Sequence, residues 1–238
     1  MTPFANRAFE ASLLAENDRL RLPINDTADG STMHGFGWQH AWEIVATSPD
    51  KTELRHVYER SDPYAYEARL SMALRPGQAH FELSVLNIGE HPLPFGIGLH
   101  PWFPRSATTR LQMRAAASLR LGPRYRATGF GPLEEADNYG EGQPVPSETA
   151  VSFIDWDGVA MLTYPETGLS LTISASETMR HPVLWTPANA PFVCLEPQSH
   201  AIGAPSEAIV RKATPMAMLK PGENLSGWIA LEPRLIQA

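Results

Sequence analysis

The sequence predicts an all-β protein, either a sandwich or a barrel, on three observations. Its 238 residues include 22 prolines and 17 glycines. Because these are spread along the whole length, they leave few windows in which a helix could run for many turns. Apolar and polar residues alternate with period two in several segments, most clearly at 80–86. Turn sequences, such as those at 75–77 and 164–168, separate these segments.

We expect the following elements along the chain. Residues 5–16 have helix-forming composition and predict a helix. The segment at 129–150 is rich in Gly, Pro and Glu and has no periodicity, so it predicts a long surface loop. With no internal repeat or linker in view, residues 1–238 are expected to form a single domain. Strands are predicted at 54–58, 66–74, 80–86, 111–115, 159–164, 169–173, 192–196 and 227–231.

Composition excludes several classes of function. The formal net charge of −7 offers no basic surface for phosphates, so nucleic acid is not an expected partner. Cys194 is the only cysteine, which rules out an internal disulfide and a cysteine-based metal cluster and suits a reducing cytoplasm. The acidic, polar start does not resemble an export signal, and no apolar run reaches the roughly 20 residues that span a bilayer. We therefore expect a cytoplasmic protein with no membrane contact.

Three segments, at 33–42, 95–103 and 193–200, place titratable residues among aromatic residues and glycines. In the second segment, strand alternation predicts that two glycines share a face with His100 and Trp102. Such a hollow suits a pyranose, whose C–H faces contact aromatic rings and whose hydroxyls contact polar groups. Alternatively, His100 is a hydrogen-bonded histidine at the end of a strand.

The other two segments leave similar choices open. Glu196 prolongs a buried-looking strand face, where a carboxylate is costly unless it is paired, protonated or used in chemistry. The alternative is a glutamate that caps a turn and points into water. His34 fits either a site or an ordinary loop, and for His40 we favour a structural role. A metal site of His34, His100 and Glu196 is chemically possible, but nothing in the spacing demands it.

Taken together and in this order, the segments resemble those of the aldose 1-epimerase, or galactose mutarotase-like, family, over nearly the whole chain. Asn6-Arg7 matches a sugar-binding N-R dipeptide, and His34 matches a histidine in an H-G-F segment. The sequence L-H-P-W-F carries His100 at the position of the general acid, and V-C-L-E-P-Q-S-H carries Glu196 at that of the general base. The resemblance implies a large antiparallel β-sandwich with the site on a concave sheet face, and no required cofactor or metal.

The implied chemistry fits these residue types. A base removes the proton of the C1 hydroxyl while an acid protonates the ring oxygen, which opens the ring; rotation and reclosure give the other anomer. Glu196 and His100 suit these roles if their environments keep them in opposite protonation states. We expect Arg7 and His34 to bind the ring oxygen and hydroxyls, and Trp102 or Trp185 to stack on the sugar.

Two departures from the family pattern bear on function. Ala150 stands where many members carry a sugar-binding aspartate, for which Asp137 or Asp155 could substitute, so substrate choice is expected to differ. The chain also begins only a few residues before Arg7, where members usually have further strands. The sandwich is therefore expected to lack N-terminal strands, and the exposed edge would favour a homodimer.

The leading hypothesis is an aldose 1-epimerase that acts on a free hexose or related aldose without a cofactor. A second is a non-catalytic sugar-binding or regulatory protein of the same fold. A third is a hexose-6-phosphate 1-epimerase, which needs a cationic pocket. Arg105, Arg124 and Arg126 are the cluster that suggests one, although surface solvation explains them equally well.

Overall fold

The computed structural model describes residues 1–16, 18–60 and 62–236. Within these residues one α-helix, α1, covers Ala208–Ala213, and short 3₁₀ helices lie at Phe9–Ala11, Gly37–Gln39, Pro123–Tyr125, Glu135–Asp137 and Glu177–Met179. The strands are β1 (Arg7–Ala8), β2 (Ser12–Leu14), β3 (Arg19–Arg21), β4 (Thr32–Met33), β5 (Glu43–Thr47), β6 (Lys51–Tyr58), β7 (Tyr66–Arg75), β8 (Gln78–Asn87), β9 (Leu93–Phe95), β10 (Trp102–Pro104), β11 (Arg110–Leu121), β12 (Ala127–Gly131), β13 (Gln143–Pro144), β14 (Thr149–Tyr164), β15 (Leu169–Ala175), β16 (Val183–Thr186), β17 (Phe192–Glu196), β18 (Ala217–Leu219) and β19 (Asn224–Leu235).

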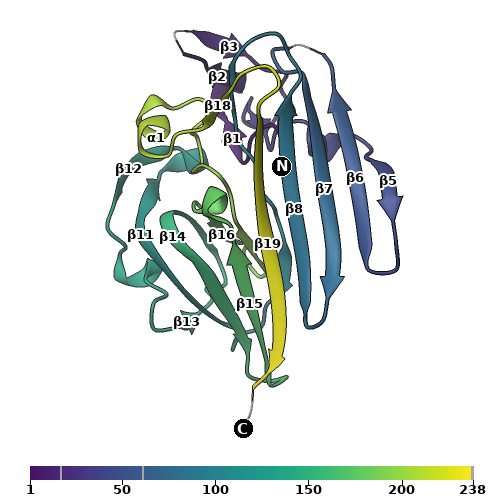
Figure 1. The fold of residues 1–238 in the computed structure, drawn as a ribbon. Coiled ribbons are helices and arrows are strands. Elements are labelled where there is room, and N and C mark those ends of the chain that lie inside the picture. The colour runs from purple at the N-terminus through teal and green to yellow at the C-terminus, as the bar shows by residue number, and fades with distance from the viewer. Residues whose placement is uncertain (17, 61, 237–238) are drawn as a thin grey trace.

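A 13-stranded antiparallel sheet dominates the fold, so the predicted all-β class is confirmed. Its main path runs β10-β17-β16-β14-β15-β19-β8-β7-β6-β5, and β11 joins β14, β12 and β13. Figure 1 shows β5 to β8 and β19 side by side along one half of the molecule, with β11 and β14 to β16 in the other half. No helix in the described residues is long and apolar enough to cross a membrane.

Each of the eight predicted strands lies within an observed strand: β6, β7, β8, β11, β14, β15, β17 and β19. The predicted loop at 129–150 is wrong at both ends and is also interrupted by β13, which pairs with β11. β12 occupies its beginning, because this segment pairs with β11 as a hairpin, with Phe130 opposite Leu119. β14 begins at Thr149, where it pairs with β16. Long-range pairing supplies the order that the composition of this segment did not reveal.

The predicted helix at 5–16 is also wrong. The segment forms β1, a 3₁₀ turn and β2, and Glu10 and Ala11 in the turn have φ angles of 56° and 45°. Its backbone pairs with other segments, since β1 lies against β4 and β2 against β3. Phe4, Phe9 and Leu13 are buried in the core. Tertiary packing therefore overrides the local helix propensity.

The N-terminal residues are fixed by contacts to distant parts of the chain. The carbonyl of Thr2 accepts hydrogen bonds from the backbone N–H groups of Phe36 and Gly37, at 2.9 and 3.1 Å. The carbonyl of Pro3 accepts from Gly96 N–H at 2.8 Å. The Ala5 N–H donates to Nε2 of the fully buried His200 at 3.2 Å. These bonds set the path of the chain that leads to Arg7.

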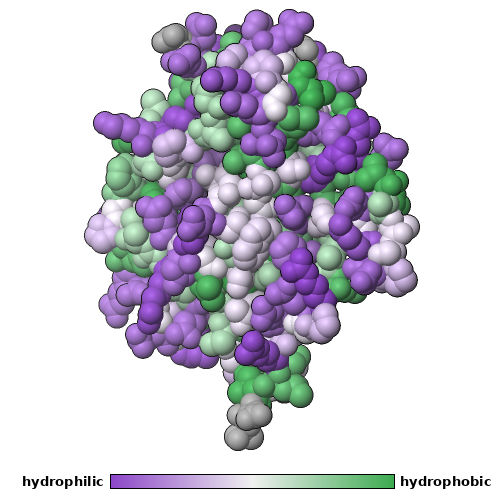
Figure 2. All heavy atoms as spheres, viewed as in Figure 1, coloured by the Kyte–Doolittle hydropathy of each residue, from purple (hydrophilic) through white to green (hydrophobic). Residues whose placement is uncertain are grey.

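The face seen in Figure 2 is mixed rather than uniformly apolar, with hydrophilic side chains interrupting the hydrophobic ones. A hydrophobic group stands out near the C-terminal end of β19. There, Leu235 is exposed beside its strand partner Leu169. Exposed apolar side chains are common on the surfaces of folded proteins.

Gly96 tests the packing of this N-terminal segment. A Cβ atom at Gly96 would overlap the His200 imidazole, which is buried and cannot move away freely. We expect Gly96→Ala to lower the free energy of unfolding by about 1–3 kcal/mol, measured by urea denaturation. Gly129→Ala is the matched control, because a Cβ there meets no atom within 4 Å, and it should change stability by less than about 0.5 kcal/mol. Equal stability of the two variants would contradict this description of the packing.

Candidate active site

A cavity of about 550 Å³ lies over the β10-β17-β16-β14 part of the sheet. That volume is within the usual range for small-molecule sites. The structure brings together at this cavity all six residues that the sequence singled out for binding or catalysis. They are Arg7, His34, His100, Trp102, Trp185 and Glu196.

Strand register explains how Trp102, Trp185 and Glu196 come to lie on one face of the sheet. Trp102 on β10 lies opposite Cys194 on β17, which lies opposite Trp185 on β16, which in turn lies opposite Ala150 on β14. Residues directly opposite one another in adjacent strands project on the same side of a sheet. Glu196 is two residues beyond Cys194, so it projects on that side too.

The sequence predicts that the two glycines of segment 95–103 form the hollow of the site beside His100, and this prediction is wrong. Gly96 and Gly98 are not among the residues that line the cavity. A Cβ at Gly96 would meet His200, and one at Gly98 would lie 2.9 Å from the Ala5 side chain. Gly96 therefore makes room for His200, and Gly98 makes room for Met1 and Ala5. The floor of the cavity is built from β14, β16 and β17 instead.

Glu196 and His100 lie against each other in this cavity. His100 Nε2 lies 3.2 Å from Glu196 Oε1, and the Gln198 side-chain amide donates to Glu196 Oε2 at 3.1 Å. Glu196 is only 2% exposed. Burial raises the pKa of Glu196 to about 8, and burial lowers the pKa of His100 to about 4. Near neutral pH the pair therefore holds one proton, placed on the carboxyl group.

His34 has its ring orientation and its tautomer set by Asn6. Nδ1 of His34 accepts a hydrogen bond from the Asn6 backbone N–H at 3.1 Å, while the His34 N–H donates to the Asn6 carbonyl at 2.7 Å. Both residues adopt positive φ, 57° at His34 and 54° at Asn6, which this reciprocal pairing holds. Burial lowers the pKa of His34 to about 3, so the ring is neutral and carries its proton on Nε2.

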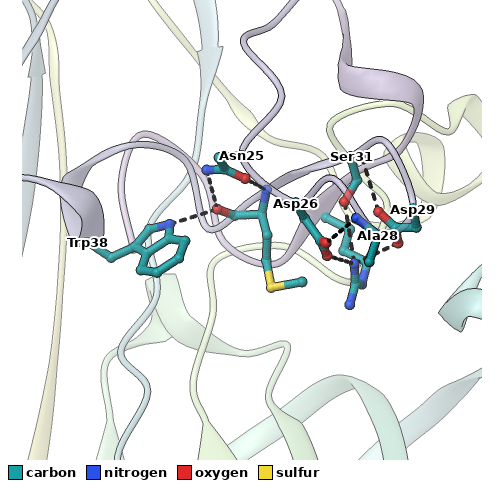
Figure 3. Close-up of polar contacts among 8 residues, drawn as sticks. Asn25, Asp26, Ala28, Asp29, Ser31 and Trp38 are labelled. Carbon is teal, nitrogen blue, oxygen red and sulfur yellow. Dashed lines mark hydrogen bonds and ion pairs between the residues drawn. The ribbon is translucent and has the colours of Figure 1, made fainter.

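Arg7 is held by two aspartates that the sequence analysis did not identify. One oxygen each of Asp26 and Asp29 lies 2.7 Å from Arg7 Nη1. The second oxygen of each accepts a backbone N–H two residues further on, from Ala28 and Ser31 respectively, and shapes the loop (Figure 3). Turns in which an aspartate side chain accepts a nearby backbone N–H can be recognised from sequence. The ion pairs that these two aspartates form with Arg7 cannot. The two carboxylates outweigh the single positive charge of Arg7.

The same loop also supports Trp38, which the sequence analysis likewise did not assign to the site. Asn25 bonds both backbone groups of Met33, and the Met33 carbonyl in turn accepts the Trp38 indole N–H at 2.9 Å (Figure 3). Trp38 lines the cavity and is 56% exposed. His40, expected to be structural, is not among the lining residues and stacks on His56.

Aromatic side chains enclose the rest of the cavity. Trp102 is 57% exposed. The centroid of its ring lies 4.2 Å from the ring centroid of Phe192 and 6.1 Å from that of Trp185. Tyr125, also missed from sequence, lies beneath the Arg7 guanidinium, 5.5 Å from the ring centroid. Its φ of 62° is unusual for a non-glycine residue.

Other residues considered from sequence lie elsewhere. Asp137 and Asp155 do not line the cavity. Arg105 donates to the Val145 carbonyl, and Arg126 pairs with Glu10 and Glu207. None of the three arginines of the suggested cluster, Arg105, Arg124 and Arg126, is among the lining residues.

Two of the three residues considered for a metal site, His100 and Glu196, lie together with Cys194. Ligand atoms of His100, Cys194 and Glu196 all lie within 4.8 Å of one another. Metal binding requires a thiolate, and burial raises the pKa of the Cys194 thiol to about 12. These groups are therefore better suited to exchanging a proton than to holding an ion.

Asp29→Asn tests the loop that holds Arg7. The amide oxygen can still accept the Ser31 N–H, but the ion pair with the largely buried Arg7 is lost. We expect the free energy of unfolding to fall by about 1–3 kcal/mol in urea denaturation. Asp50→Asn is the control, since its exposed side chain accepts only a hydroxyl group, that of Ser48, and should cost less than about 0.5 kcal/mol. A cost no larger at Asp29 than at Asp50 would show that the pair does not order the loop.

Comparison with known proteins gives one family. The family model described as aldose 1-epimerase matches residues 1–232. The uncharacterised protein YphB of Escherichia coli K12 is 30% identical over 243 residues, which cover 97% of this chain and 81% of YphB. The crystal structure of a candidate aldose 1-epimerase from Escherichia coli K12 has a TM-score of 0.90 at 27% identity, covering 98% of this chain and 82% of that one. A galactose mutarotase-like protein from Clostridium acetobutylicum has a TM-score of 0.81 at 19% identity, covering 97% and 77%.

Proposed function

The chain belongs to the aldose 1-epimerase family, and on that premise we propose that it interconverts the α and β anomers of an aldose. We propose further that it does so in the cytoplasm as a single domain, residues 1–238, with no cofactor. The observation that carries the proposal is the close approach of His100 Nε2 to the buried Glu196 carboxyl group at the cavity. Both oxygens that exchange protons in this reaction are bonded to the same carbon, C1. An acid and a base only 3.2 Å apart can therefore reach both.

The proposed reaction moves one proton in each direction. Transfer of the shared proton from Glu196 to His100 Nε2 gives a carboxylate base beside an imidazolium acid. The carboxylate takes the proton of the C1 hydroxyl, and the imidazolium protonates the ring oxygen. The C1–O5 bond breaks as the C1 carbonyl forms. After rotation about C1–C2, the O5 hydroxyl attacks the other face of the carbonyl, returns its proton to His100, and the new C1 hydroxyl regains a proton from Glu196.

The remaining site residues are proposed to hold the sugar. His34 offers an Nε2–H donor, which suits a ring oxygen or hydroxyl, because Nδ1 is occupied by the Asn6 N–H. Arg7 has Nη1 committed to Asp26 and Asp29, which leaves Nε and Nη2 as donors for sugar hydroxyls. Trp102 and Trp185 provide faces on which the pyranose can stack.

The charge around Arg7 weighs against a sugar phosphate as substrate. A phosphate needs a net positive pocket, whereas Asp26 and Asp29 together outweigh Arg7. No described residue that lines the cavity, other than Arg7, is an arginine or lysine. A free aldose is thus favoured over a hexose phosphate. The non-catalytic alternative is separated from an enzyme by the rate that the wild-type protein gives in the assay below.

Substitutions at the pair test the assignment of acid and base. We expect Glu196→Gln and His100→Gln each to lower kcat/KM for anomer exchange by about 10²- to 10⁴-fold, because each removes one proton carrier. The exchange is followed by NMR with glucose and galactose, after subtraction of the spontaneous rate. Glu134→Gln and His40→Gln make the same chemical changes away from the cavity and should retain wild-type rates. Saturable sugar binding by a wild-type protein that does not accelerate exchange would select the non-catalytic alternative.

The pH dependence tests the proton count of the pair. Only the singly protonated pair contains both an acid and a base, so activity should be lost when a second proton binds and when the last one leaves. We expect a bell-shaped profile of kcat/KM with apparent pKa values near 4 and near 8, which belong to the pair as a unit. Polarimetry from pH 3.5 to 9, corrected for the spontaneous rate, measures it. A rate that keeps rising through pH 9 would contradict a proton held by Glu196.

A further inference from the structure

The cavity has a polar side and an apolar side. Arg7, His34, His100 and Glu196 supply the polar side. The apolar side consists of four residues from β14, β16 and the segment after β17, and their side chains are hydrocarbon apart from one indole nitrogen. These four, named here the apolar wall, are Ala150, Val183, Trp185 and Ile202.

The apolar wall lies within reach of a sugar held by the acid–base pair. Val183 is the direct strand partner of Glu196, and Trp185, two residues further along β16, is the partner of Ala150. Neighbouring strands are about 4.8 Å apart. Beyond Val183 the next partner on β14 is Ser152, so Ala150 lies diagonally from Glu196, two strands across and two residues along. A pyranose with C1 at Glu196 that runs diagonally across β16 brings one of its other carbons, or that carbon's substituent, toward Ala150.

A hydroxyl group that faces Ala150 finds no acceptor on the wall. Alternation turns Thr149 and Val151 to the opposite face of the sheet, and leaves Ser152 on the same face as Ala150. Ser152 is fully buried, and its oxygen accepts the backbone N–H of Ile202 at 3.5 Å. The backbone of Ala150 is itself paired with that of Trp185. The indole N–H of Trp185 could donate to a hydroxyl, but it cannot accept from one.

This arrangement penalises a hydroxyl at one position and favours hydrogen or methyl there. A sugar hydroxyl that gives up its hydrogen bonds to water at this wall, and does not regain all of them from the protein, weakens binding. An apolar group at the same place strengthens binding. We infer that the substrate is a deoxy sugar, an aldose that lacks the hydroxyl group on the carbon facing Ala150. The inference rests on the proposed function and adds the chemical class of the substrate to it.

The test is anomer exchange with a panel of glucose and its 2-, 3-, 4- and 6-deoxy derivatives, and the same panel in the galactose series. We expect one deoxy position to give a kcat/KM at least about tenfold above that of the parent sugar. Ala150→Ser adds a hydroxyl that can accept and donate, and should reduce this preference at least threefold. Ala150→Cys is the matched control, since a thiol has nearly the same shape but bonds weakly, and it should keep the preference.

The outcomes separate this inference from the proposed function. Exchange of the parent sugars at rates equal to or above those of all their deoxy derivatives would overturn the inference while leaving the epimerase intact. A preference that Ser and Cys alter equally would show that volume at Ala150, not hydrogen bonding, selects the sugar, which also overturns it. No acceleration of any sugar in the panel would contradict the proposed function itself.

Discussion

Burial of the Glu196 carboxyl group is the constraint on which the rest of the site depends. Its position at the end of β17 places it over the sheet, where it has little access to water. An isolated carboxylate there would be expensive, so the group needs a proton, a partner or both. Gln198, two residues further along the chain, donates a hydrogen bond to it, and His100 from a distant segment places Nε2 3.2 Å from Oε1. The same desolvation that makes the carboxyl hard to ionise also makes it a strong base once its proton has moved to His100.

The N-terminal segment serves the site by a different route. Gly96 leaves room for the His200 ring and Gly98 leaves room for Met1 and Ala5, and hydrogen bonds fix the path of the segment. At the end of that path, Asn6 holds His34 in one tautomer, and the next residue, Arg7, enters the loop carrying Asp26 and Asp29. The polar side of the cavity is thus ordered in advance, which would lower the entropy cost of binding the proposed sugar.

Local patterns predicted the strands well because period-two alternation is a property of each strand's own sequence and does not depend on its neighbours. Alternation also placed Glu196 on a buried face, although the residues alone left its function open, and the family motifs were needed to join it to Arg7, His34 and His100. What sequence reasoning missed depends on long-range contacts. The helix expected at 5–16 is overridden by burial against distant strands, and the ion pairs of Arg7 with Asp26 and Asp29 exist only in the folded chain.

The central claim is that Glu196 shares one proton with His100 and holds it near neutral pH. The most direct measurement is ¹³C NMR of the glutamate side-chain carboxyl groups in labelled protein, with Glu196→Gln used to assign the signal. We expect one carboxyl resonance that is protonated at pH 6 and titrates near pH 8. A Glu196 resonance that is already ionised at pH 6 and titrates near 4.3, as an ordinary glutamate does, would contradict it.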